Sequence, residues 1–473
     1  MTTTASSLSI GRTTAETRTW AALAVLMSGT FMIVLDFFIV NVALPAMQLD
    51  LHASTSALEW VVAGYGLTFA ACLITAGRFG DLVGRRRVFS IGLGLFTLTS
   101  VTCGLAPTPQ ILIVGRLVQG LAAALISPNV LAIIGVAYHG RERVRAHTVY
   151  GMVMGFAAAG AQLIGGALVQ ADLLGLGWRT VFLINLPVGL AGVFLAPRHL
   201  PESRSSNARV DVIGTLLITT GLAAMLLPLV NGREQGYPAW TWVSFGLAPI
   251  ILATFFAQQL RLSRRGGGPL LELELFRERS FSAGLLTQLA FWTSMASFFV
   301  VLALYLQQGR GLNALQAGLV FTILASAYLV TSLRAPRLAL RYGRRLILVG
   351  ALVQASGYAL LMAGVGLASD ATWVVEVAPG LLLAGAGMGL CITPLVATVL
   401  SNVPAQYAGA ASGTLSTVQQ LGNALGVAIT GILFFGSLSN GYSAAFEVVL
   451  AQFTVLLLFV AAVSRLLPRG SHP

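Results

Sequence analysis

Fourteen long apolar runs divide this chain, and they limit its possible folds more than any other feature. Each run has roughly 20 or more residues, the length that an α-helix needs to cross a bilayer. The predicted spans are 20–48, 56–79, 87–107, 109–138, 144–171, 177–197, 210–231, 239–260, 280–308, 313–335, 343–368, 372–399, 405–435 and 444–466. Only 9% of the residues are charged, whereas a soluble protein carries about 25%. The sequence therefore predicts an all-α polytopic protein of the cell membrane, with the lipid bilayer as its surroundings.

The placement of arginine predicts how these helices are oriented. All 28 basic residues are arginines, and only Arg116, Arg179, Arg233 and Arg310 fall outside the terminal segments and alternate loops. Cytoplasmic loops carry such an excess of positive charge, so both termini are predicted to be cytoplasmic. The same distribution accounts for the net charge of +12 without nucleic acid as a partner.

Three further observations exclude classes of chemistry. Because the chain contains no lysine, it can form neither a Walker-A phosphate loop nor a lysine Schiff base with retinal or pyridoxal phosphate. Cys72, Cys103 and Cys391 are far apart in apolar segments and are interpreted as small buried residues. All five histidines lie in or beside predicted loops. No cofactor, metal site or catalytic cluster is predicted.

An approximate internal repeat divides the chain. The segments "GRFGDLVGRRR" (77–87) and "RLALRYGRR" (337–345) both place a glycine, Gly84 or Gly343, directly before paired arginines. This offset maps the first six spans onto the last six and leaves two spans as an insert, an arrangement typical of transporters. The predicted regions are a cytoplasmic segment 1–19, a six-helix bundle 20–197, an insert with its linker 198–279, a second six-helix bundle 280–466, and a tail 467–473 that resembles a protease-site scar.

Several motifs together resemble one known family. "GRFGDLVGRRRVF" resembles the signature loop of the major facilitator superfamily, and its matching residues are Gly77, Asp81, Gly84, Arg85 and Arg86. "VLDFFIVNVALP" (34–45) and "RLVQG" (116–120) resemble motifs of the fourteen-helix drug:proton antiporter branch, as do segments 178–189 and 409–428. Helix five departs from the branch, because "AQLIGG" (161–166) has Ala161 and Gln162 in place of the usual glycine and proline.

The resemblance implies a major-facilitator fold with two six-helix bundles and two inserted helices. It also implies an exporter of lipophilic small molecules, including cationic ones, that exchanges them for protons by alternating access. In the family, the loop at 77–87 is thought to act as a cytoplasmic gate. Two alternatives remain open from the sequence: a symporter that imports a nutrient, and a membrane-embedded enzyme.

Three charged residues within predicted spans are candidates for proton coupling. Asp36 lies in the first span, where an isolated carboxylate costs several kcal/mol to bury. By resemblance, Arg116 moves protons or positions Asp36, and the repeat places Glu376 nearly opposite Arg116. The alternatives are a permanent Asp36–Arg116 ion pair, an Arg116 that extends to the lipid headgroups, and a Glu376 at the membrane interface.

Aromatic and amide side chains on the predicted pore-side helices suggest a cavity for lipophilic compounds. Most aromatic residues in membrane proteins face lipid or pack between helices, so this is a hypothesis about the set. Its members are Phe31, Phe37, Phe38, Asn41, Tyr65, Gln119, Gln162, Phe291, Trp292, Phe298, Tyr305 and Gln419.

Overall fold

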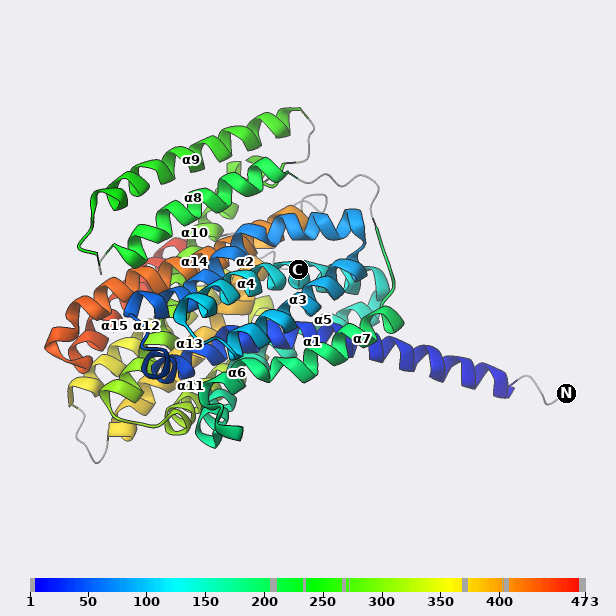
Figure 1. Ribbon diagram of the computed structural model, residues 1–473. Helices are drawn as coiled ribbons and strands as arrows, with labels where there is room; N and C mark the ends of the chain where they lie inside the picture. Colours follow the sequence, from blue (N-terminus) through cyan, green and yellow to red (C-terminus); the bar gives the residue numbers. More distant parts are fainter. Residues whose placement is uncertain are drawn as a thin grey trace.

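Every regular element in the computed structural model is a helix, within the residues that it describes (Figure 1). Those residues are 5–204, 211–232, 235–265, 269–271, 273–367, 373–401, 403 and 408–467. Thirteen described helices are long and apolar enough to cross a membrane, and the bent pair Val149–Ala158 and Gly160–Ala171 makes fourteen if it is one span. The predicted all-α membrane fold is confirmed. Residues 1–4 and 468–473 of the predicted terminal segments lie outside the described residues.

The first half of the fold comprises the N-terminal helices. They are α1 (Ala5–Leu51), α2 (Thr55–Val83), α3 (Arg85–Gly104), α4 (Pro109–Ala137), α5 (Gly140–Ala171), α6 (Thr180–Leu183) and α7 (Asn185–His199). A short 3-10 turn, α6 and α7 together form one span, Gly177–His199. α1 begins well before the first predicted span, so its first turns extend beyond the other helices (Figure 1).

The inserted pair and the C-terminal helices follow. They are α8 (Val212–Asn231) and α9 (Ala239–Arg264), then α10 (Arg279–Leu304), α11 (Ala314–Tyr342), α12 (Arg344–Leu367), α13 (Trp373–Leu400), α14 (Ala408–Ser437) and α15 (Tyr442–Val463). A π-helical turn, Tyr305–Gly309, extends α10.

Local sequence signals explain several helix ends. The side chains of Thr108 and Asn313 accept hydrogen bonds from backbone N–H groups and so begin α4 and α11. Gly84 and Gly343 have φ angles of +124° and +51°, which glycine adopts without the steric penalty of a side chain. Gly84 separates α2 from α3, and Gly343 separates α11 from α12. The two glycines of the sequence repeat therefore have the same structural role, which is to join two consecutive helices.

Helix packing repeats between the two halves. α1 packs against α5 and α7, as α10 packs against α14 and α15, and α4 packs against α2 and α3, as α13 packs against α11 and α12. The halves meet most extensively at two interfaces, α2 with α14 and α5 with α11, and α1 also contacts α10 between them. The repeat relates α2 to α11 and α5 to α14, so each large interface joins one helix of the first kind to one of the second. This is expected for two similar halves that face each other.

The inserted helix α8 packs on only one of these interfaces. The Trp60 indole on α2 donates a hydrogen bond to Asn231 Oδ1 on α8, with an N–O distance of 3.1 Å. Leu222 and Leu226 of α8 belong to the same buried cluster as Trp60 and Ala424 of α14. α8 therefore contacts both halves beside the α2–α14 interface, and Figure 1 shows α8 and α9 on that side of the molecule.

Candidate functional site

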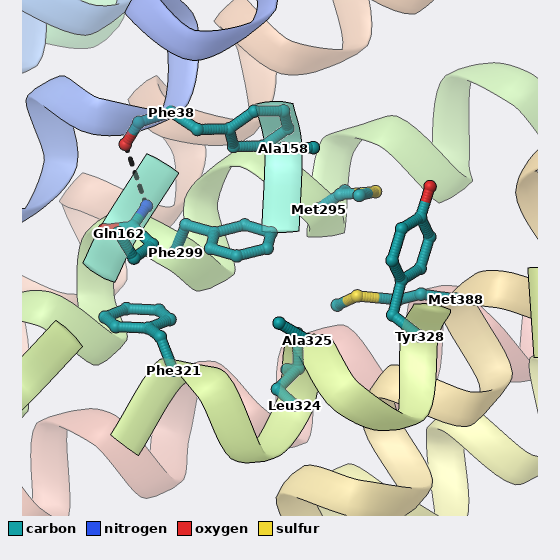
Figure 2. Close-up of a pocket in the computed structure, with 10 residues that line it drawn as sticks. All are labelled: Phe38, Ala158, Gln162, Met295, Phe299, Phe321, Leu324, Ala325, Tyr328 and Met388. Carbon is teal, nitrogen blue, oxygen red and sulfur yellow. Dashed lines mark hydrogen bonds between the residues drawn. The ribbon is translucent and has the colours of Figure 1, made fainter. Parts of the chain in front are cut away.

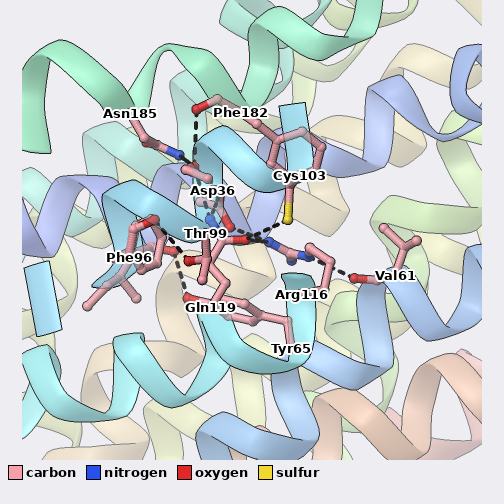
Figure 3. A network of polar contacts seen from close by, with 12 residues as sticks. Asp36, Val61, Tyr65, Phe96, Thr99, Cys103, Arg116, Gln119, Phe182 and Asn185 are labelled. Carbon is pink, nitrogen blue, oxygen red and sulfur yellow. Dashed lines mark hydrogen bonds and ion pairs between the residues drawn. The ribbon is translucent and has the colours of Figure 1, made fainter. Parts of the chain in front are cut away.

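A carboxylate in the middle of α1 is enclosed by the N-terminal helices. Asp36 has no exposed surface, and Figure 3 shows it among side chains from several of these helices. Its Oδ2 oxygen accepts a hydrogen bond from the Arg116 guanidinium. Its Oδ1 oxygen accepts one from Gln119 Nε2 and one from Asn185 Nδ2, each at 3.0 Å. The two candidates Asp36 and Arg116 thus form a buried ion pair, and the structure also brings Gln119 to it.

Arg116 holds the ion pair to α2. Its Nε donates to the Val61 carbonyl at 2.9 Å, and one terminal nitrogen donates to Gln119 Oε1 at 2.8 Å. The guanidinium carbon lies 4.3 Å from the centre of the Tyr65 ring, a cation–π contact. The side chain is only 1% exposed, so Arg116 does not extend to the lipid headgroups.

A serine on α3 completes the cluster. Gln119 Nε2 and Asn185 Nδ2 both donate to Ser100 Oγ, at 3.1 and 2.8 Å. Ser100 in turn donates to the Phe182 carbonyl at 3.1 Å. Sequence reasoning missed the roles of Ser100 and Asn185. Asn185 lies within a segment that resembled the family, whereas no feature of the sequence distinguished Ser100 from the other hydroxyl residues of α3. We call these five residues, Asp36, Ser100, Arg116, Gln119 and Asn185, the acid cluster.

Asp36 is not the only hydrogen-bond acceptor that Arg116 reaches. Burying an ion pair is costly unless further hydrogen bonds satisfy both partners. Here the Arg116 donors also reach two neutral oxygens, Val61 O and Gln119 Oε1. If Asp36 takes up a proton, Arg116 loses its anionic partner, and two neutral acceptors, Val61 O and Gln119 Oε1, remain within its reach.

A narrow pocket lies between the two halves (Figure 2). Its volume is about 20 Å³, enough for about one water molecule. Phe38 and Phe299 meet across it with ring centres 5.1 Å apart, and Phe299 stacks on Phe321 at 5.8 Å. Its lining residues are Phe38, Ala158, Gln162, Met295, Phe299, Phe321, Leu324, Ala325, Tyr328 and Met388. We call it the aromatic pocket.

Sequence reasoning identified only two residues of the aromatic pocket, Phe38 and Gln162. It missed the contributions of α10, α11 and α13, because an aromatic or methionine residue in an apolar helix gives no signal of the face it occupies. Phe38 is two residues from Asp36, which places the two side chains about 200° apart around α1. The acid cluster and the aromatic pocket therefore lie on opposite sides of one helix.

A larger cavity of about 430 Å³ opens at the end of the molecule where α2 and α4 end and α14 begins. We call it the inner cavity, and it is lined by both halves. Its lining residues are Leu73, Gly77, Arg78, Asp81, Arg85, Ser127, Pro128, Leu131, Ala132, Leu270, Ser412, Gly413 and Ser416. Arg344 begins α12, the equivalent of α3 in the repeat, and it donates hydrogen bonds to the carbonyls of Arg465 and Leu467. The second half thus also contributes an arginine to this end of the molecule, which we call the arginine-rich end.

Ion pairs of the predicted gating loop join it to other parts of the N-terminal half. Asp81 pairs with Arg85 at 2.7 Å, and Glu202, just after α7, lies within 4 Å of Arg86 and Arg87. The Arg85 N–H donates to the Ser203 carbonyl at 3.1 Å. Among the described residues, these pairs join α2, α3 and the segment after α7, and none of them crosses to the C-terminal helices. Sequence reasoning missed Glu202.

At the opposite end, the two halves are in contact. Gln307 Nε2 donates to the Val42 carbonyl, and Gln308 Nε2 donates to Gln48 Oε1, both at 2.8 Å. A Cβ atom on Gly166 of α5 would lie 2.4 Å from the Ala314 carbonyl of α11, so the backbones touch there. The structure is thus closed at this end and has its larger cavity at the arginine-rich end.

Several predicted cavity residues lie elsewhere. The ring centre of Phe298 lies 4.8 Å from that of Tyr358 on α12. Tyr305 stacks on Phe446 of α15 with ring centres 4.6 Å apart. Both therefore face the C-terminal helices instead of the aromatic pocket. The residues of the predicted set that line neither the aromatic pocket nor the inner cavity also include Phe31, Phe37, Asn41, Tyr65, Gln119, Phe291, Trp292 and Gln419.

Glu376 is separate from the acid cluster. It lies in the first turn of α13, and its carbonyl would be 2.6 Å from a Cβ atom on Gly364 of α12. The repeat relates its position to that of Arg116, but in the other half of the fold. The structure therefore brings together two of the three proton-coupling candidates.

Comparisons with known proteins agree with this architecture. The sequence model of the Major Facilitator Superfamily matches residues 26–427. The chain is 40% identical over 433 residues to a probable actinorhodin transporter of Streptomyces coelicolor, covering 91% of this chain and 75% of that protein. It is 34% identical over 472 residues to the cephamycin export protein CmcT of Amycolatopsis lactamdurans, covering 97% and 94%. A crystal structure of a POT family transporter with 5-aminolevulinic acid has a TM-score of 0.66 at 16% identity, covering 94% and 96%, and at that identity it supports the fold alone.

Proposed function

Because the chain belongs to the Major Facilitator Superfamily, we propose that it exports lipophilic small molecules across the cell membrane in exchange for protons. The chain is a membrane transporter and not a membrane-embedded enzyme. The proposal concerns the direction of transport, the substrate class and the coupling ion.

The direction of transport is proposed from the names of related proteins. Several proteins at least 30% identical to this chain over most of its length are named for the export of, or resistance to, antibiotics and drugs. The aromatic pocket is lined by phenylalanine, methionine and leucine, which match a lipophilic compound of this kind in polarity, and the pocket must widen from about 20 Å³ to hold one. Export also agrees with an inner cavity that opens at the arginine-rich end, which we assign to the cytoplasm from the positive-inside rule.

Asp36 is the proposed proton carrier. A carboxylate that is protonated in one conformation and ionised in the other gives a transporter access to the proton gradient. One proton crossing a membrane potential of about 150 mV supplies about 3.5 kcal/mol, which corresponds to a concentration ratio of about 300. This is sufficient to lower the cytoplasmic concentration of a drug substantially.

A series of ring contacts supports a link between proton and substrate. Arg116 lies over Tyr65, which packs against Phe37 at 6.0 Å, and Phe37 packs against Phe38 at 5.0 Å. Phe38 then reaches Phe299 of the opposite half. We propose that a change in the charge of Asp36 moves Arg116 and, through these rings, the wall of the aromatic pocket.

Vesicle transport tests the proposal. The chain is expressed in a host that lacks its own drug pumps, and a susceptibility panel first identifies a compound to which it confers resistance. Energised inside-out vesicles are expected to accumulate that compound, and collapsing the proton gradient with a protonophore is expected to stop the accumulation. Vesicles from the same host without the chain are the control. Accumulation in energised right-side-out vesicles would instead support an importer.

A further inference from the structure

Gln162 stands where the family motif has proline, and it borders the aromatic pocket. It lies on α5 and is only 1% exposed. Its Nε2 donates a hydrogen bond to the Phe38 carbonyl at 2.8 Å (Figure 2). Because a carbonyl oxygen can only accept, this bond determines which end of the amide is the nitrogen. The sequence departure therefore gives α5 a hydrogen bond to α1 and leaves an oriented amide oxygen.

That oxygen has no hydrogen-bond donor. Gln162 Oε1 is buried, and no described group donates to it. A buried acceptor without a donor is unfavourable, so a ligand that supplies a donor recovers this cost on binding. The other polar side chain of the pocket lining, Tyr328, lies at the far side of the pocket from Gln162 (Figure 2).

The surroundings of Gln162 are apolar and aromatic. Phe38, Phe299 and Phe321 lie around it in Figure 2. A Cβ atom on Gly318 of α11 would come within 2.7 Å of the Gln162 carbonyl, so α5 and α11 cross in close contact at this residue. In this conformation the pocket admits about one water molecule, so a ligand enters only when α5 and α11 separate. It would then lie beside the Gln162 amide and against these rings.

We propose that the aromatic pocket binds lipophilic aromatic compounds that carry one O–H or N–H donor, and that Gln162 Oε1 accepts the hydrogen bond from this donor. The proposal rests on the proposed function, since it specifies which lipophilic compounds the exporter takes. Gln162 is thus a specificity-determining residue. A compound of the same shape without the donor leaves the oxygen unsatisfied and binds more weakly.

A matched pair of probes tests the proposal on the complete chain. 2-Naphthol carries an O–H donor, and its methyl ether 2-methoxynaphthalene does not. Binding of each to purified protein in lipid nanodiscs is measured by equilibrium dialysis, with empty nanodiscs to subtract partition into lipid. We expect wild-type protein to bind 2-naphthol on the order of tenfold more tightly than the ether.

The variant Gln162→Met has nearly the same size and provides no acceptor oxygen. We expect it to bind the two probes with nearly equal affinity while it still binds the ether. Gln354→Met is the matched control, because Gln354 is also completely buried with an Oε1 oxygen to which no described group donates, but it lies on α12 away from the pocket. This control is expected to keep the wild-type preference.

Two results would overturn the proposal. The first is seen in the wild-type protein alone: it binds both probes with equal affinity or shows no saturable binding of 2-naphthol. The other is a preference that persists in Gln162→Met. Export is measured separately in inside-out vesicles with a compound from the susceptibility panel. If the compound is still exported while the two probes bind with equal affinity, the proposal that Gln162 recognises a donor is wrong and the proposed export function stands.

Discussion

Arg116 holds the acid cluster together through the shape of its side chain as well as its charge. Its planar guanidinium donates at once to Asp36, Val61 O and Gln119 Oε1. A lysine ammonium is a compact charge on a flexible chain and cannot reproduce that fork. The positions of Asp36 and Gln119 therefore depend on the identity of this residue.

We predict that Arg116→Lys lowers transport by at least tenfold and destabilises the protein, because the substitution leaves buried acceptors without donors. The cost is expected to be about 1–3 kcal/mol. Arg179→Lys is the matched control, since Arg179 pairs with Asp50 at 2.7 Å with its side chain 25% exposed, and partly exposed pairs contribute about 0–1 kcal/mol. Drug efflux and thermal melting of the two variants in detergent are compared. Equal effects of the two substitutions would contradict the role given to Arg116.

The helices themselves were largely predictable, because hydropathy over about 20 residues reports burial in lipid directly. Each of the fourteen predicted spans overlaps one helix or helix pair of the structure. The helix faces were not predictable. Met295 and Phe321 look like any other apolar residue in their helices, and only the packing of α10 and α11 brings them to the aromatic pocket. Asp36 and Arg116 could be found because charge is rare inside a membrane.

The junction between α2 and α3 depends on Gly84, which the sequence repeat had already marked. Its φ is +124°, and a Cβ atom there would lie 2.6 Å from Glu202 Oε1. We predict that Gly84→Ala destabilises the protein by about 1–3 kcal/mol through backbone strain and displacement of Glu202. The expected result is a clearly lower melting temperature.

Gly151→Ala is the control for that substitution. A Cβ atom on Gly151 of α5 would meet nothing within 4 Å, and alanine favours a helix over glycine by about 1 kcal/mol. Its melting temperature is expected to stay unchanged or to rise. If Gly84→Ala melted no lower than Gly151→Ala, the strained junction would not matter for stability.

The whole molecule is closed at the end opposite the arginine-rich end, where Gln48 of one half meets Gln308 of the other. An alternating-access exporter must separate these residues to release its substrate. We predict that a short bifunctional thiol reagent joins the cysteines of a Gln48→Cys, Gln308→Cys double variant and stops transport, and that reduction of a cleavable reagent restores it. The single variants treated in the same way are the controls. Full transport by the cross-linked protein would mean that this end does not open.

In the proposed mechanism, Asp36 couples proton movement to export. The most direct measurement is proton movement across proteoliposomes on addition of a compound from the susceptibility panel, followed with a pH-sensitive dye inside the liposomes. Asn is nearly isosteric with Asp but does not titrate over this range. We predict that the wild-type protein moves protons when the compound is added, and that Asp36→Asn folds and binds the compound but moves none. Compound-driven proton movement by Asp36→Asn at the wild-type rate would contradict the account.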